Sequence, residues 1–408
     1  MKISSIKAFE DGDAVVLSAK IKPRHALEHR FLWFRYRGLD SMPAAEADPF
    51  VVAMLPASMH DGEPCEVDRA ISPKLSRNLL VAQRRLASWF DFLRPVPVLS
   101  APPGPADGRP AGRRAGTACC FSGGVDSWYS LIKHRHAVTH ILLVRGFDIG
   151  LENDALWHST VERIGAVAQA MDLRLVTCET NLRSVADKGR PGWGLPYDGD
   201  FWGQCLHGAA LAAVALPLSP MLGTLIVPAT HSEDSLRAWG SSPFLDPHWS
   251  NERLAIVHDG CEADRLQKVR TIAGDTLARQ SLRVCHDDRS TLNCGECEKC
   301  VRTMLALELC GALDEMATFP RRRGLAKLRR LEIPAHLQYH YERLRDAAIL
   351  SDNWPLAHRI ESALGRRPSI ERSLALLVRR ARGIQLRGHR RTPLAAPGSG
   401  LTDPAIPR

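Results

Sequence analysis

A seven-residue loop with the sequence FSGGVDS is the first part of this chain whose residue types and spacing suit chemistry. It spans residues 121–127, between an apolar, strand-like run and the expected start of a helix. At such a junction the first backbone N–H groups of the helix have no partners, and the helix dipole favours negative charge. Two adjacent glycines let the backbone wrap closely around an anion, and two hydroxyl groups add donors. The loop therefore predicts a phosphate-binding site, with the candidate residues Ser122, Gly123, Gly124, Val125, Asp126 and Ser127.

The carboxylate of Asp126 needs a role of its own, because a carboxylate by itself is a poor ligand for phosphate. We expect it either to hold the N–H groups of the loop or to bind a Mg²⁺ ion that bridges phosphate oxygens. The alternative interpretation of the whole loop is an ordinary turn followed by a helix N-cap, since glycine pairs occur in many loops.

Four cysteines within 16 residues form the second group, with the spacing C-x8-C-x2-C-x2-C. Four thiolates this close in sequence can complete a tetrahedral zinc site. Cysteines at x2 spacing also suit an iron–sulfur cluster, and His286 is an alternative ligand. Buried structural cysteines are the remaining interpretation, against which the clustering argues. The predicted metal ligands are Cys285, Cys294, Cys297 and Cys300.

The composition is that of a globular protein, with 45% hydrophobic and 24% charged residues in a chain of 408. This length is enough for more than one domain. The start of the chain is charged and not apolar, which predicts that a secretory signal is absent and that the protein is cytoplasmic. Because the cytosol keeps thiols reduced, we expect the 11 cysteines to be free thiols or metal ligands and not disulfides. The longest apolar region, 207–230, contains two prolines. It predicts a buried helix and a buried strand rather than a membrane span.

The positive charge is concentrated near the C-terminus. Residues 321–408 contain 19 Lys/Arg and 7 Asp/Glu, a net charge of +12, compared with +9 for the whole chain. Such a basic segment contacts nucleic acid or an acidic partner in some proteins and is a solvated helical surface in others. Nucleic-acid binding is therefore one expectation for this region.

Composition and periodicity divide the chain into six segments. Strand-like runs at 15–22, 30–37 and 50–54, followed by a helix that starts after Ser72, predict a small N-terminal unit. A stretch rich in Pro, Gly and Ala is expected to separate this unit from the rest. The expected segments are an N-terminal α+β domain (1–95), a linker (96–116), an α/β domain (117–284), a metal knuckle with its following helix (285–311), a basic helical region (312–382) and a disordered tail (383–408).

Apolar runs alternate with helical stretches from residue 117 onward. The expected strands are 117–121, 141–144, 173–177, 222–228 and 254–258, and the expected helices are 127–136, 154–170, 200–216, 297–311, 335–350 and 369–383. Short strands that are apolar on both faces and separated by helices predict an α/β fold with a doubly wound parallel sheet. In such sheets ligands bind beyond the carboxyl ends of the strands, which is where the loop at 121–127 lies.

The loop resembles the pyrophosphatase loop of the adenylating ATP pyrophosphatase (PP-loop) superfamily, and no Walker-type Gly-Lys-Ser/Thr follows it. Together with the four cysteines and Val301-Arg302 directly after them, it makes residues 117–305 similar to 7-cyano-7-deazaguanine synthase and its relatives. The resemblance implies an adenine nucleotide alpha hydrolase-like fold, ATP and Mg²⁺ as cofactors and a structural zinc ion. The implied reaction turns a carbonyl or carboxyl oxygen into an adenylate with release of pyrophosphate, and a nitrogen or sulfur nucleophile then displaces AMP.

The resemblance also implies further site residues. Lys268, on the expected helix before the cysteines, would add a cation, and we expect Asp126, Lys268 and Asp234 to form the catalytic set. The adenine is expected at the end of the second strand, against Val144 and Phe147. The segment 230–235 differs from the family's Gly-x-Asn-x-x-Asp-like pattern, so we expect a different small-molecule acceptor. Its candidate binding residues are His231, Asp234, Ser241 and Asp246.

Two other functions stay open at this point. The basic C-terminal region favours an ATP-dependent tRNA-modifying, thiolating enzyme. The chain also suits a nucleotide-binding zinc module that serves a multiprotein system without turnover of its own. The oligomeric state is not predicted by any of these patterns.

Overall fold

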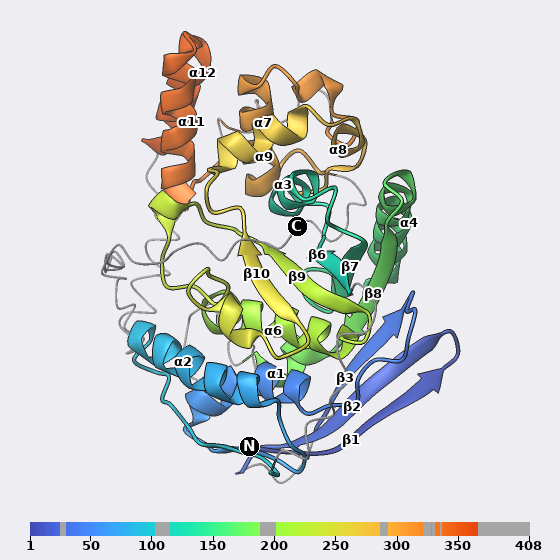
Figure 1. Cartoon of the computed structure of the whole chain (residues 1–408). Helices are drawn as coiled ribbons and strands as arrows, with labels where there is room; N and C mark the ends of the chain where they lie inside the picture. The colour runs from blue at the N-terminus through green and yellow to red at the C-terminus, as the bar shows by residue number, and fades with distance from the viewer. Residues whose placement is uncertain are drawn as a thin grey trace.

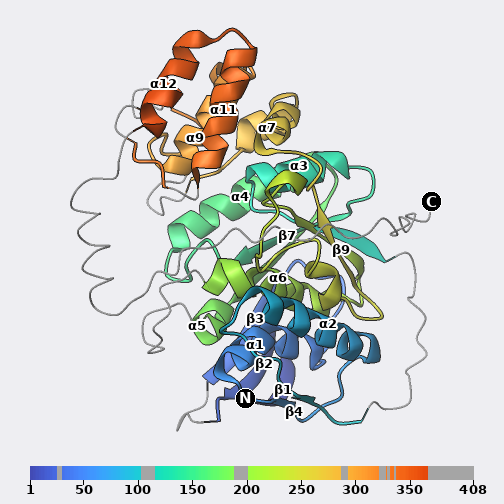
Figure 2. The ribbon, with the colours of Figure 1, turned by 90° about the vertical axis from the view of Figure 1, so that its left-hand side faces the viewer.

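A ten-stranded sheet runs through the computed structural model of this chain, in the strand order β10-β9-β6-β7-β8-β3-β2-β1-β4-β5 (Figures 1 and 2). The structure describes residues 1–24, 30–102, 115–187, 201–285, 293–320, 328, 331–334 and 337–365. The strands are β1 Lys2–Asp11, β2 Ala14–Lys22, β3 Arg30–Arg37, β4 Cys65–Val67, β5 Val98–Leu99, β6 Gly116–Cys120, β7 His140–Arg145, β8 Arg174–Thr180, β9 Leu222–Pro228 and β10 Ala255–Asp259. The helices are α1 Asp48–Asp61, α2 Pro73–Trp89, α3 Val125–Lys133, α4 Asp154–Ala170, α5 Leu182–Ala186, α6 His207–Ala215, α7 Arg265–Ala273, α8 Thr276–Ser281, α9 Glu298–Leu309, α11 Gln338–Leu350 and α12 Trp354–Leu364.

The strands β6 to β10 make the parallel part of the sheet. β6 pairs with β7 and β9, while β8 and β10 pair with the outer sides of these two neighbours. All five strands expected after residue 117 are confirmed, and β9 has the expected bounds. The chain passes from β6 outward to β7 and β8 and then returns to the other side of β6 for β9. The direction of winding therefore reverses at β6.

Helices cover both faces of these parallel strands. Cys119 of β6 and Ile141 of β7 belong to a buried cluster with residues of α3, α4, α7 and α9. Their neighbours Ala118 and Leu142 belong to a second cluster with residues of α1, α2 and α6. Because successive side chains of a strand point to opposite faces, strands buried on both sides must be apolar throughout. This is the pattern that the sequence predicted.

The N-terminal strands continue the same sheet and do not form one of their own. β1, β2 and β3 are antiparallel neighbours, and β3 pairs with β8 over residues 34–37. The expectation that residues 1–95 form a unit set apart by the linker is corrected in this respect. An open β8 edge would leave unpaired backbone groups, and β3 covers them. Tyr36 of β3 is fully buried and donates its hydroxyl to Val214 O at 2.8 Å, which also ties this strand to α6.

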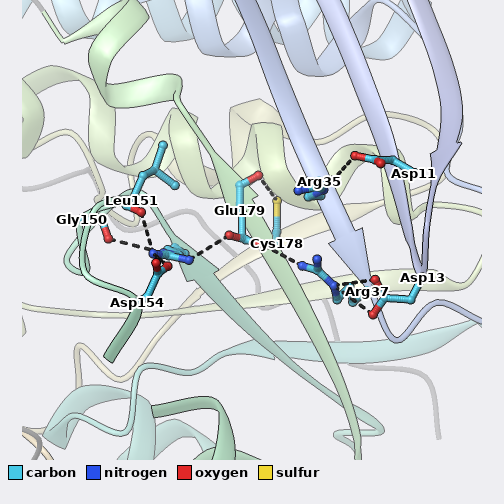
Figure 3. Close-up of polar contacts among 10 residues, drawn as sticks. Asp11, Asp13, Arg35, Arg37, Gly150, Leu151, Asp154, Cys178 and Glu179 are labelled. Atoms are coloured by element: carbon cyan, nitrogen blue, oxygen red, sulfur yellow. Dashed lines mark hydrogen bonds and ion pairs between the residues drawn. The ribbon is translucent and has the colours of Figure 1, made fainter. Parts of the chain in front are cut away.

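A network of charged side chains crosses the join between β3 and β8 (Figure 3). Arg37 Nη1 donates to Glu179 Oε1 at 2.5 Å, and Glu179 Oε2 accepts from Arg145 Nη1 at 3.1 Å. Arg145 also donates to Leu151 O at 2.6 Å and pairs with Asp154 at the start of α4. The Arg145 side chain is only 6% exposed. This buried guanidinium therefore fixes the loop after β7 to the sheet.

One expected strand is a helix instead. Residues 50–54 lie within α1, where Pro49 occupies an early helical position, as its fixed φ allows. Nearly every residue of α1 is buried, so its sequence has no polar face. An apolar run without periodicity does not distinguish a strand from a buried helix. The helix expected after Ser72 is confirmed as α2, with Pro73 at its first position.

The C-terminal helices pack on the outer side of α9. α9 and α11 match the helices expected at 297–311 and 335–350, and α12 lies beside α11 (Figure 2). Tyr341 and Leu344 of α11 are buried in the same cluster as α9. The helix expected at 369–383, the tail at 383–408 and residues 103–114 of the linker lie outside the described residues. Among the helices that are described, none has the length and apolar character needed to cross a membrane.

Candidate functional site

The loop at 121–127 joins the carboxyl end of β6 to the N-terminus of α3. Gly123 has a φ of +76°, a conformation that L side chains rarely adopt, so this turn requires glycine. The Gly124 carbonyl accepts the hydroxyl of Ser127 at 3.0 Å, which stabilises the loop from within. Ser122 is exposed, and the first N–H groups of α3 have no intrahelical acceptors. The loop thus offers backbone donors and one hydroxyl to an anion.

Asp126 lies between two cations that follow it by well over a hundred residues. Its carboxylate oxygens pair with Arg265 Nη1 at 2.9 Å and Lys268 Nζ at 3.2 Å. Burial by itself would raise the pKa of Asp126, but Arg265 and Lys268 outweigh burial and lower it to about 2. We expected Asp126 either to hold the N–H groups of the loop or to bind Mg²⁺. The described contacts of its carboxylate do not include the N–H groups of the loop. The carboxylate instead joins the loop to α7.

Lys268 is a fixed cation and not a mobile one. Its side chain is 2% exposed and donates to Ala229 O at 2.6 Å, at the carboxyl end of β9. Asp264 caps α7 by accepting from Gln267 N at 2.8 Å, which starts the helix so that positions 265 and 268 face the loop. The structure therefore brings the predicted pair Asp126 and Lys268 together and adds Arg265.

A pocket is lined by Arg265 and Lys268 but not by Asp126. Its volume is about 520 Å³ when the space at its open mouth is included. It is walled by the segment after β9, the start of α7, one face of α9 and one face of α11. Its polar lining residues are Thr230, Ser232, Ser235, Asp264, Arg265, Lys268, Arg302, Tyr339, His340 and Arg343. Burial, followed by the charges of Arg302 and Arg265, lowers the pKa of His340 to about 3. That histidine is therefore neutral near pH 7.

The segment after β9 carries two of the expected acceptor residues. Asp234 accepts from the Tyr339 hydroxyl at 2.8 Å and forms an ion pair with Arg343. His231 accepts from Arg237 Nε at 3.2 Å, and burial, with Arg237 acting in the same direction, lowers the pKa of His231 to about 4. Asp234 therefore holds α11 against the pocket, and His231 is a neutral side chain beside it.

The other two expected acceptor residues are in a buried network. Ser241 Oγ donates to Asp246 Oδ2 at 2.7 Å, and His258 Nδ1 lies 2.7 Å from the same oxygen. Burial alone would lower the pKa of His258, but the bond to Asp246, together with Cys261, raises it to about 9. Asp246 is fully buried, and neither Ser241 nor Asp246 lines the pocket. These contacts hold the loop before β10 onto the strand.

The two residues expected to contact the adenine are packed against other parts of the chain. Phe147 lies 4.8 Å from the ring of Trp202, measured between centroids, and its carbonyl accepts from Arg183 Nη1 at 2.9 Å. Val144 pairs with Cys178 in the sheet. An adenine bound here would have to use backbone groups other than those that already form these hydrogen bonds.

The four cysteines form a compact cluster. Their Sγ atoms all lie within 4.8 Å of one another, and the pairs Cys285–Cys297 and Cys294–Cys300 are each 3.9 Å apart. A tetrahedral ion with Zn–S bonds of about 2.3 Å separates its sulfurs by about 3.8 Å. The cluster therefore can hold a metal such as zinc. His286 lies outside the described residues.

Backbone and amide groups preorganise this cluster. Cys297 N lies 3.2 Å from Cys294 Sγ as a donor, and Gly295 has a φ of +71° in the turn between them. Asn293 accepts from Val284 N at 2.8 Å and donates to Leu282 O at 2.8 Å. Because these bonds join the segments before and after residues 286–292, the first cysteine is held against the other three.

Several pocket residues were not predicted from the sequence. Arg265 stands three positions before Lys268 on α7, and this i, i+3 spacing is a signal that could have found it. Arg302 lies two positions after Cys300, the last cysteine of the cluster. Tyr339, His340 and Arg343 reach the pocket only because α11 packs against α9, and no local pattern indicates that contact.

No protein-family model matches the chain, and a search of curated proteins finds no match.

Proposed function

We propose that the chain is an ATP-dependent adenylating enzyme of the PP-loop type, similar to 7-cyano-7-deazaguanine synthases but with a different acceptor. The observation that carries the proposal is the junction of the loop with α7, where Asp126 meets Arg265 and Lys268. Glycine backbone, an unpartnered helix N-terminus and two fixed cations are what the triphosphate of a nucleotide requires.

The position of the loop in the sheet supports the same proposal. The winding reverses at β6, and ligands of doubly wound sheets bind at such a switch point, beyond the carboxyl ends of the strands. We therefore propose that β6 to β10 form a doubly wound sheet of the adenine nucleotide alpha hydrolase-like type. The N-terminal strands extend this sheet at β8, away from the proposed nucleotide site.

The chain's own groups act in the proposed reaction mainly by position and charge. ATP supplies the adenylyl group, and a Mg²⁺ ion, for which Asp126 is the candidate ligand, would neutralise phosphate charge. Ser122 and the N–H groups of the loop bind phosphate oxygens, while Lys268 and Arg265 neutralise the charge that develops on the leaving pyrophosphate. Because Lys268 is anchored on Ala229 O, it needs little reorganisation during the reaction.

The metal in this proposal is a zinc ion with a structural role. Four sulfurs within 4.8 Å suit one central ion better than an iron–sulfur cluster, whose ligands surround several atoms. Four thiolates leave no open position for an activated water. Cys297 and Cys300 flank the start of α9, so the ion would fix the helix that carries Arg302 into the pocket.

The test is a screen of small carboxylic acids and amides for ATP-dependent release of pyrophosphate with formation of AMP. Asp126→Asn is expected to lower the rate at least ~10²-fold, the scale for loss of a preorganised electrostatic contact. Asp154→Asn is the matched control, because that carboxylate pairs with Arg145 and is 73% exposed. AMP formation in Asp126→Asn at the rate of the control would remove the loop from the mechanism.

The basic region at 321–408 favours a second candidate, an ATP-dependent tRNA-modifying enzyme. Its net charge of +12 would bind phosphates of RNA in a strongly salt-dependent way. Retention of tRNA at moderate salt would favour this function, and ATP binding without AMP formation for any acceptor would favour a non-catalytic module.

A further inference from the structure

The pocket between α7, α9 and α11 is separate from the phosphate loop. None of its described lining residues belongs to 121–127. Arg265 and Lys268 form the boundary, since they contact Asp126 on one side and line the pocket on the other. A second ligand group can therefore bind next to the loop without displacing a nucleotide from it.

The described lining of this pocket combines apolar side chains with a group of hydrogen-bond donors. Its described lining residues include four cationic side chains, together with three hydroxyl groups from the segment after β9. The carboxylate in the described lining is Asp264, and it already accepts from Gln267 N at the start of α7. Such a lining favours an anion, because guanidinium groups pair geometrically with carboxylate and phosphate.

The arginines have capacity that their present partners do not use. Arg265 Nε is buried and has no hydrogen-bond partner among the residues that the structure describes. Arg302 pairs with Glu298 at 2.9 Å. Arg265 and Arg302 both line the pocket, so an anion bound there can accept hydrogen bonds from both guanidinium groups.

Arg343 is the most readily exchanged of these cations. Its ion pair with Asp234 has about half of each side chain exposed, and such surface pairs contribute little. The guanidinium can leave this carboxylate for a ligand at small cost. Arg343 also lies beyond residues 117–305, so the family resemblance does not supply it.

We propose that this pocket binds an anionic group, a phosphate or a carboxylate, of the acceptor, with Arg302 and Arg343 as its principal ligands. The identification of the ligand as the acceptor rests on the proposed function, whereas the anion site rests on the pocket alone.

Isothermal titration of the full chain, without nucleotide, tests the anion site. Inorganic phosphate and acetate are the two probes, which separate the two anion classes. We expect saturable binding of one of them, weakened about 10-fold or more in Arg343→Gln and in Arg302→Gln, as for the loss of one charge-assisted hydrogen bond. Arg345→Gln is the matched control, because this residue lies on the same helix and pairs with Glu361 of α12.

Ser122→Ala separates this proposal from the proposed function. Binding that is lost in Ser122→Ala and kept in Arg343→Gln would place the anion in the loop and overturn the pocket site. Absence of binding for both probes, or equal weakening in Arg345→Gln and Arg343→Gln, would overturn it as well. The metal content of Arg302→Gln is measured in the same preparation. Partial recovery of anion binding in Arg302→Lys would exclude a folding defect as the cause of the weaker binding.

Discussion

The ion pair between buried Lys268 and partly exposed Asp126 gives a prediction whose size follows from the structure. The pKa of Asp126 is lowered from 3.8 to about 2, which corresponds to about 2–3 kcal/mol of folding free energy. Because the folded pKa lies below the ordinary value, this stabilisation is present above about pH 4 and is lost as the pH falls toward 2. At pH 7 it is complete. Two cations share it, so Lys268 contributes about 1 kcal/mol through Asp126.

Replacing Lys268 by methionine has a second cost. Ala229 O loses its 2.6 Å donor, and an unsatisfied buried carbonyl costs about 1–3 kcal/mol. The expected decrease in the free energy of unfolding for Lys268→Met is therefore about 2–4 kcal/mol. Urea unfolding at pH 7, followed by tryptophan fluorescence, measures it.

The matched control for this measurement is Arg253→Met. Arg253 pairs with Glu46 at the surface, with 40% and 36% of the side chains exposed, and its loss should cost less than about 1 kcal/mol. In the double variant Asp126→Asn/Lys268→Met the cost should be smaller than the sum of the single costs, because the two residues interact. Equal stability of Lys268→Met and Arg253→Met would refute the reasoning.

Four further predictions concern the metal, the loop, pH and the tail. The purified chain should contain one zinc ion, and Cys297→Ser should lose both the ion and thermal stability; elemental analysis that finds iron with labile sulfide would contradict this. Ser122→Ala should lower AMP formation while the melting temperature stays unchanged, since the side chain is exposed; a change in both would assign the serine to the fold. The pKa of His258 is raised to about 9, so its contribution to stability is complete below about pH 6.5 and is lost as the pH rises through 9. His258→Gln should therefore flatten the pH dependence of the free energy of unfolding between these values. An unaltered slope would show that another group titrates there. Removal of residues 383–408 should leave pyrophosphate release unchanged, because their Gly, Pro and Arg content offers little apolar surface to offset ordering; loss of turnover with a free small acceptor would show that the tail reaches the site.

Local patterns were sufficient wherever one segment carries the whole signal. The alternation of apolar runs and helices predicted β6 to β10, because each strand of a parallel sheet is apolar on both faces. The spacing of the cysteines predicted a cluster whose sulfurs do lie within 4.8 Å. Residues 50–54 show the limit of such patterns, since an apolar run is the same whether its burial is in a strand or in α1.

The tertiary structure decided which distant residues meet. Ser241 and Asp246 were expected to bind the acceptor, but their contacts with each other and with His258 make them part of a buried network. Pairing between β3 and β8 joins the N-terminal strands to the sheet that contains β6 to β10. The packing of α11 brings Arg343 into the lining of the pocket that Arg265 also lines.

The sequence by itself therefore determined the loop, the cysteine cluster and the parallel strands of this protein. Each of these depends on backbone conformation, ligand type or side-chain alternation within a few residues of the chain. Only the tertiary structure decided the partners of Asp126, the wall that α11 contributes and the edge at which the sheet is extended. These depend on which apolar faces bury each other, and burial is a property of the whole chain that no short segment encodes.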